Sequence, residues 1–126
     1  MEYKILHTCI RVNDLEESVD FYKSALGLTE TGRKVYPEDF TLVFLSDKVG
    51  AIEIELTWNY GRDIPYTIGD GFSHLAFSVE DLESSHKRHF EMGIETTELM
   101  GLPGDPPRYY FITDPNGYDI EIVRAK

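Results

Sequence analysis

The order of apolar and polar residues predicts a first run of five elements. Residues 4–12 alternate between an apolar and a polar face, which is typical of a half-buried strand. Residues 15–26 carry apolar side chains at helical spacing, with Asn13 or Asp14 placed to cap the helix and Gly27 placed to end it. Three more strands follow by the same criteria, at Leu28–Tyr36, Phe40–Ser46 and Ala51–Trp58. The first sixty residues therefore predict the order βαβββ.

The second half of the chain predicts the same order of elements. A segment rich in glycine and proline, Tyr60–Gly71, separates the two halves. After it, the pattern predicts a strand at Phe72–Val79 and a helix at Asp81–Met92, which Gly93 ends. The strands predicted next lie near Glu95–Met100, at Arg108–Thr113 and at Tyr118–Arg124. We therefore expect an α+β fold: one domain, residues 1–126, built from two tandem βαβββ units at about residues 3–60 and 71–125.

The two halves also match residue by residue. His7 opens a segment that recurs 67 residues later from His74, with valine, aspartate, leucine, glutamate and serine in the same register. The strand around Glu55 recurs 66 residues later around Glu121. Each predicted unit therefore begins with a histidine strand and ends with a glutamate strand, as expected of an internal repeat.

These two histidines and two glutamates form a candidate metal-binding set. Imidazole nitrogens and carboxylate oxygens suit a divalent first-row metal. Any one of them alone is explained as a core histidine or a solvated strand glutamate, but four at repeat-equivalent positions favour a metal site. Because side chains alternate along a strand, His7 and Arg11 are expected on the same face of the first strand. Glu55 and Asn59 are expected to share a face of their strand for the same reason. A cation and a carboxamide are therefore expected to share a cleft with the predicted ligands.

Composition narrows the function. The chain has 23 acidic and 12 basic residues and a net charge of −11, which argues against binding nucleic acid or an anionic membrane surface. The charge still allows a small anionic substrate, because one arginine or lysine can hold a carboxylate. No apolar run is long enough to span a bilayer, and the first residues do not resemble a signal peptide. The single cysteine, Cys9, fits a reducing compartment, so we expect a cytoplasmic protein.

Four segments of the chain form a distinctive combination: the histidine strand and helix at His7–Gly27, ELTWNYG at Glu55–Gly61, GFSH at Gly71–His74, and DPNGY with the following glutamate strand at Asp114–Glu121. Together they resemble the glyoxalase I family, the lactoylglutathione lyases of the vicinal-oxygen-chelate superfamily. The resemblance covers nearly the whole chain and is most specific in the second and fourth segments. It implies the tandem βαβββ fold, with half-open sheets that pair into a barrel-like cleft across a dimer.

The resemblance also implies a metal site and a way of assembling it. It assigns the metal ligands to His7, Glu55, His74 and Glu121. Because the chain is short and its first ligand is histidine, one Ni²⁺ or Co²⁺ ion per site is implied ahead of Zn²⁺. A homodimer with shared active sites is implied as well, each site taking one histidine and one glutamate from the first half of one chain and one of each from the second half of its partner. Arg11 and Asn59 would hold a carboxylate of the thiol substrate.

The implied reaction is the isomerisation of a hemithioacetal, formed from methylglyoxal and glutathione, to S-lactoylglutathione. A base moves one proton between adjacent carbons through an enediolate, whose two oxygens the metal chelates. The resemblance suggests Glu121 as the principal base and Glu55 as its counterpart for the other substrate enantiomer.

Two departures from the family pattern concern the thiol. Asp70 stands where animal relatives carry an arginine, and the loop Leu102–Pro107 has no lysine where the family carries a basic loop. Arg108 follows that loop, and we expect it to contact the substrate in place of the missing basic residues. These departures leave open whether the thiol is glutathione, which ranks first, or another cellular thiol.

Several other residues have competing interpretations. Glu53 shares the face of Glu55 and is the alternative ligand. Cys9 is interpreted as a small filler rather than a nucleophile, and His86 and His89 as solvated helix residues. Four aromatic residues are assigned to the core: Phe72, Phe77, Phe111 and Tyr118.

Two other functions fit the same fold. An extradiol dioxygenase uses two histidines and one glutamate on iron, so the second repeat-equivalent glutamate argues against it. A non-enzymatic module that sequesters ligands needs no metal-binding set, so the four candidate ligands argue against it too. A small-molecule hemithioacetal is therefore the favoured substrate.

Overall fold

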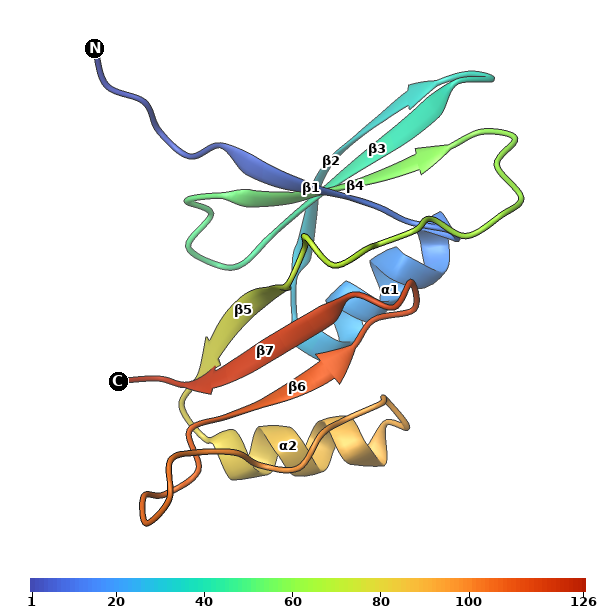
Figure 1. The fold of residues 1–126 in the computed structure, drawn as a ribbon. Helices are drawn as coiled ribbons and strands as arrows, with labels where there is room; N and C mark the ends of the chain where they lie inside the picture. Colours follow the sequence, from blue (N-terminus) through green and yellow to red (C-terminus); the bar gives the residue numbers. More distant parts are fainter. The chain divides into compact units, whose positions relative to one another are not determined.

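The first unit, Met1–Thr67, is a four-stranded sheet with one helix packed on it (Figure 1). The computed structural model describes all of residues 1–126. The elements of this unit are β1 (His7–Arg11), α1 (Leu15–Leu26), β2 (Thr29–Tyr36), β3 (Phe40–Ser46) and β4 (Glu53–Asn59). The strands lie in the order β1-β4-β3-β2, with β1 parallel to β4 and the other neighbours antiparallel.

The core of this unit lies on the face of the sheet that α1 covers. Val19, Tyr22 and Ala25 follow one another at three-residue steps along α1 and are buried. The strands and the flanking residues add Ile10, Val12, Leu28, Val43, Leu45 and Leu56. Burying a large apolar side chain of this kind contributes about 1.5–3 kcal/mol, so this face stabilises the unit and leaves the opposite face for chemistry.

Both ends of α1 follow the expected capping chemistry. Asp14 caps the first turn, because its carboxylate accepts the N–H of Glu17 at 3.0 Å. Asn13, the other candidate, instead accepts the backbone N–H of Tyr66 at 3.3 Å. Gly27 ends the helix with a φ of 68°, a conformation that glycine adopts without strain.

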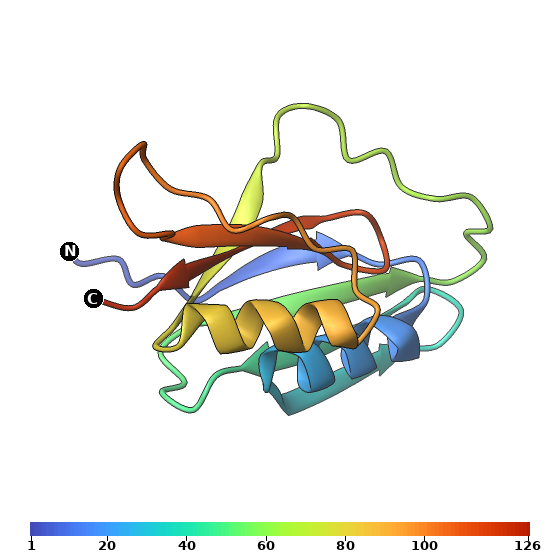
Figure 2. The ribbon, with the colours of Figure 1, turned by 90° about the horizontal axis from the view of Figure 1, so that it is seen from below.

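The second unit, Ile68–Lys126, is a three-stranded sheet with its own helix (Figure 2). Its elements are β5 (His74–Val79), α2 (Leu82–Glu91), β6 (Tyr109–Thr113) and β7 (Asp119–Arg124). The strand order is β5-β7-β6, with β5 parallel to β7 and β6 antiparallel to it. The helix starts as α1 does, since the carboxylate of Asp81 accepts the N–H of Ser84 at 3.0 Å.

The prediction of a regular strand near Glu95–Met100 is wrong. Only isolated bridges form there, between Thr96 and Ile112 and between Met100 and Tyr109. The reason is a side-chain hydrogen bond: the N–H of Phe111 donates to the hydroxyl of Thr97 at 2.9 Å instead of to a carbonyl, which interrupts the ladder. The other predicted strands are confirmed, with ends that differ by three residues at most.

The interpretation of both α2 histidines as solvated is wrong for His89. Its side chain is buried, at 2% exposure, and its Nδ1 lies 2.8 Å from the hydroxyl of Tyr110. The same hydroxyl lies 2.6 Å from Oγ of Ser85. His89 comes two turns after the buried Leu82 and therefore falls on the same face of α2. Neither helix has the length and apolar character needed to span a membrane.

Candidate active site

The first unit brings His7 and Glu55 together on one face of its sheet. β1 and β4 are parallel neighbours, and Glu55 lies opposite Cys9, two residues along from His7. Because side chains alternate along a strand, His7 and Glu55 point to the same side. Nε2 of His7 is 3.1 Å from Oε2 of Glu55, and the two side chains are 34% and 12% exposed.

The second unit repeats this arrangement with His74 and Glu121. Glu121 on β7 lies opposite Ala76, so the register between histidine and glutamate is that of the first unit. Nε2 of His74 is 3.8 Å from Oε1 of Glu121, and the side chains are 32% and 23% exposed. The two pairs therefore share residue types and register, but the second pair is looser.

A phenylalanine lies beside each pair. Phe44 on β3 is opposite Glu55, and its ring meets that of His7 edge to face with centroids 5.9 Å apart. Phe111 on β6 makes the same two contacts in the second unit, where the centroids are 5.2 Å apart. Such contacts favour one orientation of the imidazole ring. Phe44 is not among the residues predicted to be functional, and Phe111 is predicted to lie in the core. The signal that identifies both is their 67-residue spacing, the same as that of the histidines.

Ser73 contacts the other nitrogen of His74. The serine hydroxyl oxygen is 2.7 Å from Nδ1. When Nδ1 donates to this oxygen, Nε2 is the unprotonated nitrogen and can bind a cation. His7 makes no corresponding hydrogen bond, so its orientation depends on Phe44 and Glu55.

The donor atoms fit neighbouring positions around one cation. Ligand atoms about 2.1 Å from a metal and at right angles to each other are about 3.0 Å apart. The His7–Glu55 pair, at 3.1 Å, already has this spacing. The His74–Glu121 pair, at 3.8 Å, needs a small movement of the glutamate side chain. Neither unit gathers three or more histidine, cysteine, aspartate or glutamate side chains suited to a metal, so each offers two ligands.

Two other polar residues on the face of the first unit have partners of their own. The hydroxyl of Thr31 donates to the carboxylate of Glu53. Sγ of Cys9 lies 3.2 Å from the hydroxyl of Thr57. The contact with His7 is therefore made by Glu55, while Glu53, the alternative ligand, is engaged by β2.

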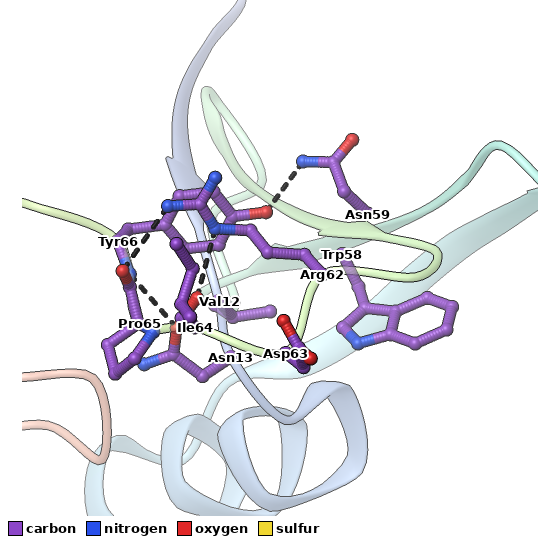
Figure 3. Close-up of a pocket in the computed structure, with 9 residues that line it drawn as sticks. All are labelled: Val12, Asn13, Trp58, Asn59, Arg62, Asp63, Ile64, Pro65 and Tyr66. Carbon is purple, nitrogen blue, oxygen red and sulfur yellow. Dashed lines mark hydrogen bonds between the residues drawn. The ribbon is translucent and has the colours of Figure 1, made fainter.

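Arg11 and Asn59 lie farther along the same face. Arg11 is opposite Thr57, and Asn59 is the last residue of β4. Nδ2 of Asn59 donates to the hydroxyl of Tyr66 at 2.7 Å. A cavity of about 280 Å³ lies beside this hydrogen bond, between the end of β4, the residues Val12 and Asn13 that precede α1, and the loop after β4 (Figure 3). The face thus continues from the His7–Glu55 pair to a cavity at the end of β4.

Comparison with known proteins decides the family. Residues 4–122 match the Glyoxalase/Bleomycin resistance protein/Dioxygenase superfamily. The chain belongs to this superfamily. The probable lactoylglutathione lyase of Synechocystis sp. is 38% identical over 96% of this chain and 95% of that protein. The lactoylglutathione lyase of Haemophilus influenzae is 37% identical over 98% and 93%.

A solved structure of the same family agrees. The trypanothione-dependent glyoxalase I of Leishmania major has a TM-score of 0.83 and 30% identity, and the match covers 98% of this chain and 87% of that one. These matches confirm the resemblance to glyoxalase I, the tandem βαβββ fold and the prediction of an enzyme of the lactoylglutathione lyase type.

Asp70, which departs from the glyoxalase I pattern, and Arg108, which is expected to replace the missing basic residues, lie outside the strands. Asp70 is exposed in the segment before β5. Arg108 directly precedes β6, and its carbonyl accepts the N–H of Arg124 at 2.8 Å. Alternation along β6 groups Arg108 with Tyr110, on the side of the sheet away from His74. The long, exposed side chain of Arg108 must therefore reach around the end of β6 to approach the histidine face.

Proposed function

We propose that this chain is a lactoylglutathione lyase. It converts the hemithioacetal of methylglyoxal and glutathione to S-lactoylglutathione in the cytoplasm. The observation that carries the proposal is the repeated pair of one histidine and one glutamate, in the same register in both units and each beside a phenylalanine. The lactoylglutathione lyases among its relatives support the same reaction.

The proposed metal ligands are the pairs His7–Glu55 and His74–Glu121. Two nitrogen and two oxygen donors suit a first-row divalent ion, and Ni²⁺ or Co²⁺ is proposed ahead of Zn²⁺. When bound, the ion would act as a Lewis acid that stabilises negative charge on two adjacent substrate oxygens. The 3.1 Å separation in the first unit supports this assignment, because it already matches two neighbouring ligands.

A homodimer with shared sites is proposed because each unit offers only two ligands. The His7–Glu55 pair of one chain would meet the second-unit pair of its partner, and two-fold symmetry would make both sites equivalent. The histidine and glutamate side chains of both pairs are partly exposed, which leaves them accessible to a second chain.

Glu121 is the proposed base. It takes the proton from the carbon that bears sulphur and returns it to the neighbouring carbon, and Glu55 does so for the other enantiomer. A base that moves a proton between two carbons needs some freedom. The carboxylate of Glu121 is farther from its histidine than that of Glu55, 3.8 Å against 3.1 Å, and its side chain is about twice as exposed, 23% against 12%.

Glutathione is the thiol ranked first. Arg11 and Asn59 are proposed to hold one of its carboxylates by charge-assisted hydrogen bonds, and Arg108 the other. The amide of Asn59 gives one N–H to Tyr66 and keeps a second N–H for the substrate. Because the Leishmania relative is described as trypanothione-dependent, the thiol must be tested directly.

The test combines metal analysis of the purified protein with an ultraviolet assay of thioester formation. Methylglyoxal and glutathione should give thioester, chelation should abolish it, and Ni²⁺ or Co²⁺ should restore it better than Zn²⁺. A ligand-sequestering protein would form no thioester, and an extradiol dioxygenase would consume oxygen with a catechol. Absence of thioester from the metal-reconstituted protein would overturn the proposal.

A further inference from the structure

The residue that precedes each histidine differs between the two units. Ser73 comes directly before His74, whereas Leu6 occupies the equivalent position before His7, 67 residues earlier. Both Ser73 and Leu6 are exposed and lie just outside their strands. Because only the serine has a polar side chain, only the second unit can hold its imidazole by a hydrogen bond from this position.

The hydroxyl of Ser73 selects one of two orientations of the His74 ring. The contact with Phe111 restricts the plane of the imidazole, since the two rings meet edge to face at 87° with centroids 5.2 Å apart. A half-turn of the imidazole about its bond to Cβ keeps this plane but exchanges each nitrogen with a carbon. Only one of the two orientations places Nδ1 2.7 Å from the serine hydroxyl and Nε2 on the side of Glu121.

Ser73 is the one hydrogen-bond partner of the His74 ring within the chain. The carboxylate of Glu121 is 3.8 Å from Nε2, which is longer than the usual hydrogen bond of about 2.7–3.2 Å. With its proton on Nε2, the ring would therefore find no acceptor within reach in the chain. With its proton on Nδ1, the ring donates to the serine hydroxyl and keeps Nε2 unprotonated.

The neutral ring of His7 favours the opposite tautomer. Its Nε2 lies 3.1 Å from Oε2 of Glu55. A carboxylate oxygen this close to a ring nitrogen favours a proton on that nitrogen, because two unshared electron pairs at this distance repel each other. The proton of His7 is therefore expected on Nε2 and that of His74 on Nδ1.

The tautomer determines how ready each histidine is to bind a metal ion. A metal ligand must offer an unprotonated nitrogen. His74 presents such a nitrogen on the side of Glu121 before any cation arrives, whereas His7 must first move its proton from Nε2 to Nδ1. The second unit is therefore the readier half of the proposed metal site.

We propose that Ser73 is a positioning residue that accepts the Nδ1 proton of His74 and makes this histidine the preformed ligand of the metal site. The inference rests on the proposed function and adds a residue that acts through His74 rather than on the ion or the substrate. It also complements the proposed role of Glu121. A histidine that is held firmly by Ser73 can keep its place while the neighbouring carboxylate moves with the proton.

Nitrogen-15 NMR of the full chain without metal measures the tautomers directly. At about pH 8.5, where free imidazole is neutral, His74 should carry its proton on Nδ1 and His7 on Nε2. His86 is an internal reference for the Nε2–H tautomer, because its Nε2 lies 2.8 Å from the carbonyl oxygen of Thr97, which can only accept. Ser73→Ala should move His74 toward a mixture of both tautomers. Ser73→Thr keeps a hydroxyl and should preserve Nδ1–H.

Metal affinity gives a second readout, measured as binding of Ni²⁺ in competition with a chelator. Ser73→Ala should weaken binding by about tenfold, the lower end of the usual range for a residue that supports a ligand, because Ser73 is exposed. Ser73→Thr should bind Ni²⁺ within about threefold of wild type. Ser78→Ala is the matched control, since Ser78 is exposed on the same face of β5 but four residues beyond His74. It should leave the tautomer and the affinity unchanged.

The inference is overturned if His74 of the wild-type protein carries its proton on Nε2. It is also overturned if Ser73→Ala leaves either the tautomer or the Ni²⁺ affinity unchanged. The same holds if Ser73→Thr loses as much affinity as Ser73→Ala, because the hydroxyl is then not responsible. Circular dichroism checks that each variant folds. Neither readout involves turnover, so failure of the proposed reaction is seen separately, as absence of thioester in the wild-type protein.

Discussion

The two histidine–glutamate pairs differ in which partner is held. In the first unit the glutamate is held: Glu55 is 12% exposed and lies 3.1 Å from its histidine. In the second unit the histidine is held, since Ser73 contacts Nδ1 of His74, whereas Glu121 lies 3.8 Å away and is 23% exposed. The same motif thus has a tight version and a loose one.

The neighbouring strands provide a physical reason. Glu55 lies on β4 in a sheet of four regular strands, in which β3 and then β2 follow β4 toward one edge of the sheet. Glu121 lies in a sheet of three, and the segment next to β6 makes only isolated bridges. Each glutamate is flanked by two strands, but the sheet around Glu121 is narrower, which agrees with its greater exposure. A duplicated unit can therefore divide two tasks, with a firm ligand in one copy and a mobile proton carrier in the other.

Replacing each glutamate by glutamine should separate these roles. Glu121→Gln should lower kcat by about 10²- to 10⁴-fold with the fold intact, because an amide cannot accept the proton. Glu55→Gln should weaken metal affinity more than it lowers kcat of the metal-saturated protein. Steady-state kinetics with metal titration and circular dichroism check both variants. Turnover of Glu121→Gln within tenfold of wild type would contradict its role as the base.

Mixing two inactive variants tests whether the unlike pairs meet across a dimer. His7→Ala and His74→Ala should each be inactive alone. In a mixed dimer one site collects both changes and the other collects neither, so random exchange should restore about a quarter of the wild-type sites. Thioester formation after verified subunit exchange is the measurement. If thioester formation does not return, the active sites are not shared between the two chains.

Arg108→Ala examines whether the second unit supplies a substrate contact, as Arg11 and Asn59 are proposed to do in the first. Loss of a charged contact with the glycyl carboxylate should lower kcat/KM for the glutathione adduct by about 30- to 150-fold. Lys87→Ala is the control for loss of surface charge. A decrease in kcat/KM of less than about threefold would show that the Arg108 side chain stays on the face of the sheet that carries Tyr110 and does not contact the substrate.

Tyr110→Phe tests the face of the second sheet that α2 covers, which differs from the helix-covered face of the first sheet. The helix face in the first unit buries Val19 and Tyr22, whereas Tyr110 in the second joins Ser85 and the buried His89 by hydrogen bonds. Removing the hydroxyl leaves a buried imidazole without this partner, which should cost about 1–3 kcal/mol of unfolding free energy at neutral pH. Urea denaturation measures this loss.

The pH dependence of stability gives a second readout for Tyr110. Burial raises its pKa above the usual 10.0, partly offset by the hydrogen bond with Ser85. Above about pH 10 the unfolded chain loses this proton while the folded chain keeps it. The stabilisation is therefore complete below that pH and is lost as the pH rises further. Tyr110→Phe should remove this part of the alkaline decline, and an unchanged decline would contradict it.

Local patterns in the sequence determined much of the molecule. The strand faces, a helix cap at Asn13 or Asp14, the stop at Gly27 and the repeat that aligns His7 with His74 all depend on residues within a few positions of each other or on a constant offset. The same periodicity put Glu55 and His7 on one kind of face, and their contact at 3.1 Å agrees with it.

Long-range packing decided the rest, because it joins residues whose spacing has no period. The hydroxyl of Thr97 interrupts a strand that the local pattern predicts. Tyr110 contacts the buried His89, and the polar residues of α2 do not predict this contact. Arg62 likewise lies 4.0 Å from the centroid of the Tyr66 ring only because the loop after β4 folds back on itself. The histidine–glutamate distance is 3.1 Å in the four-stranded sheet and 3.8 Å in the three-stranded sheet. Two motifs with the same residue types do not predict this difference, because it arises from the packing around each pair.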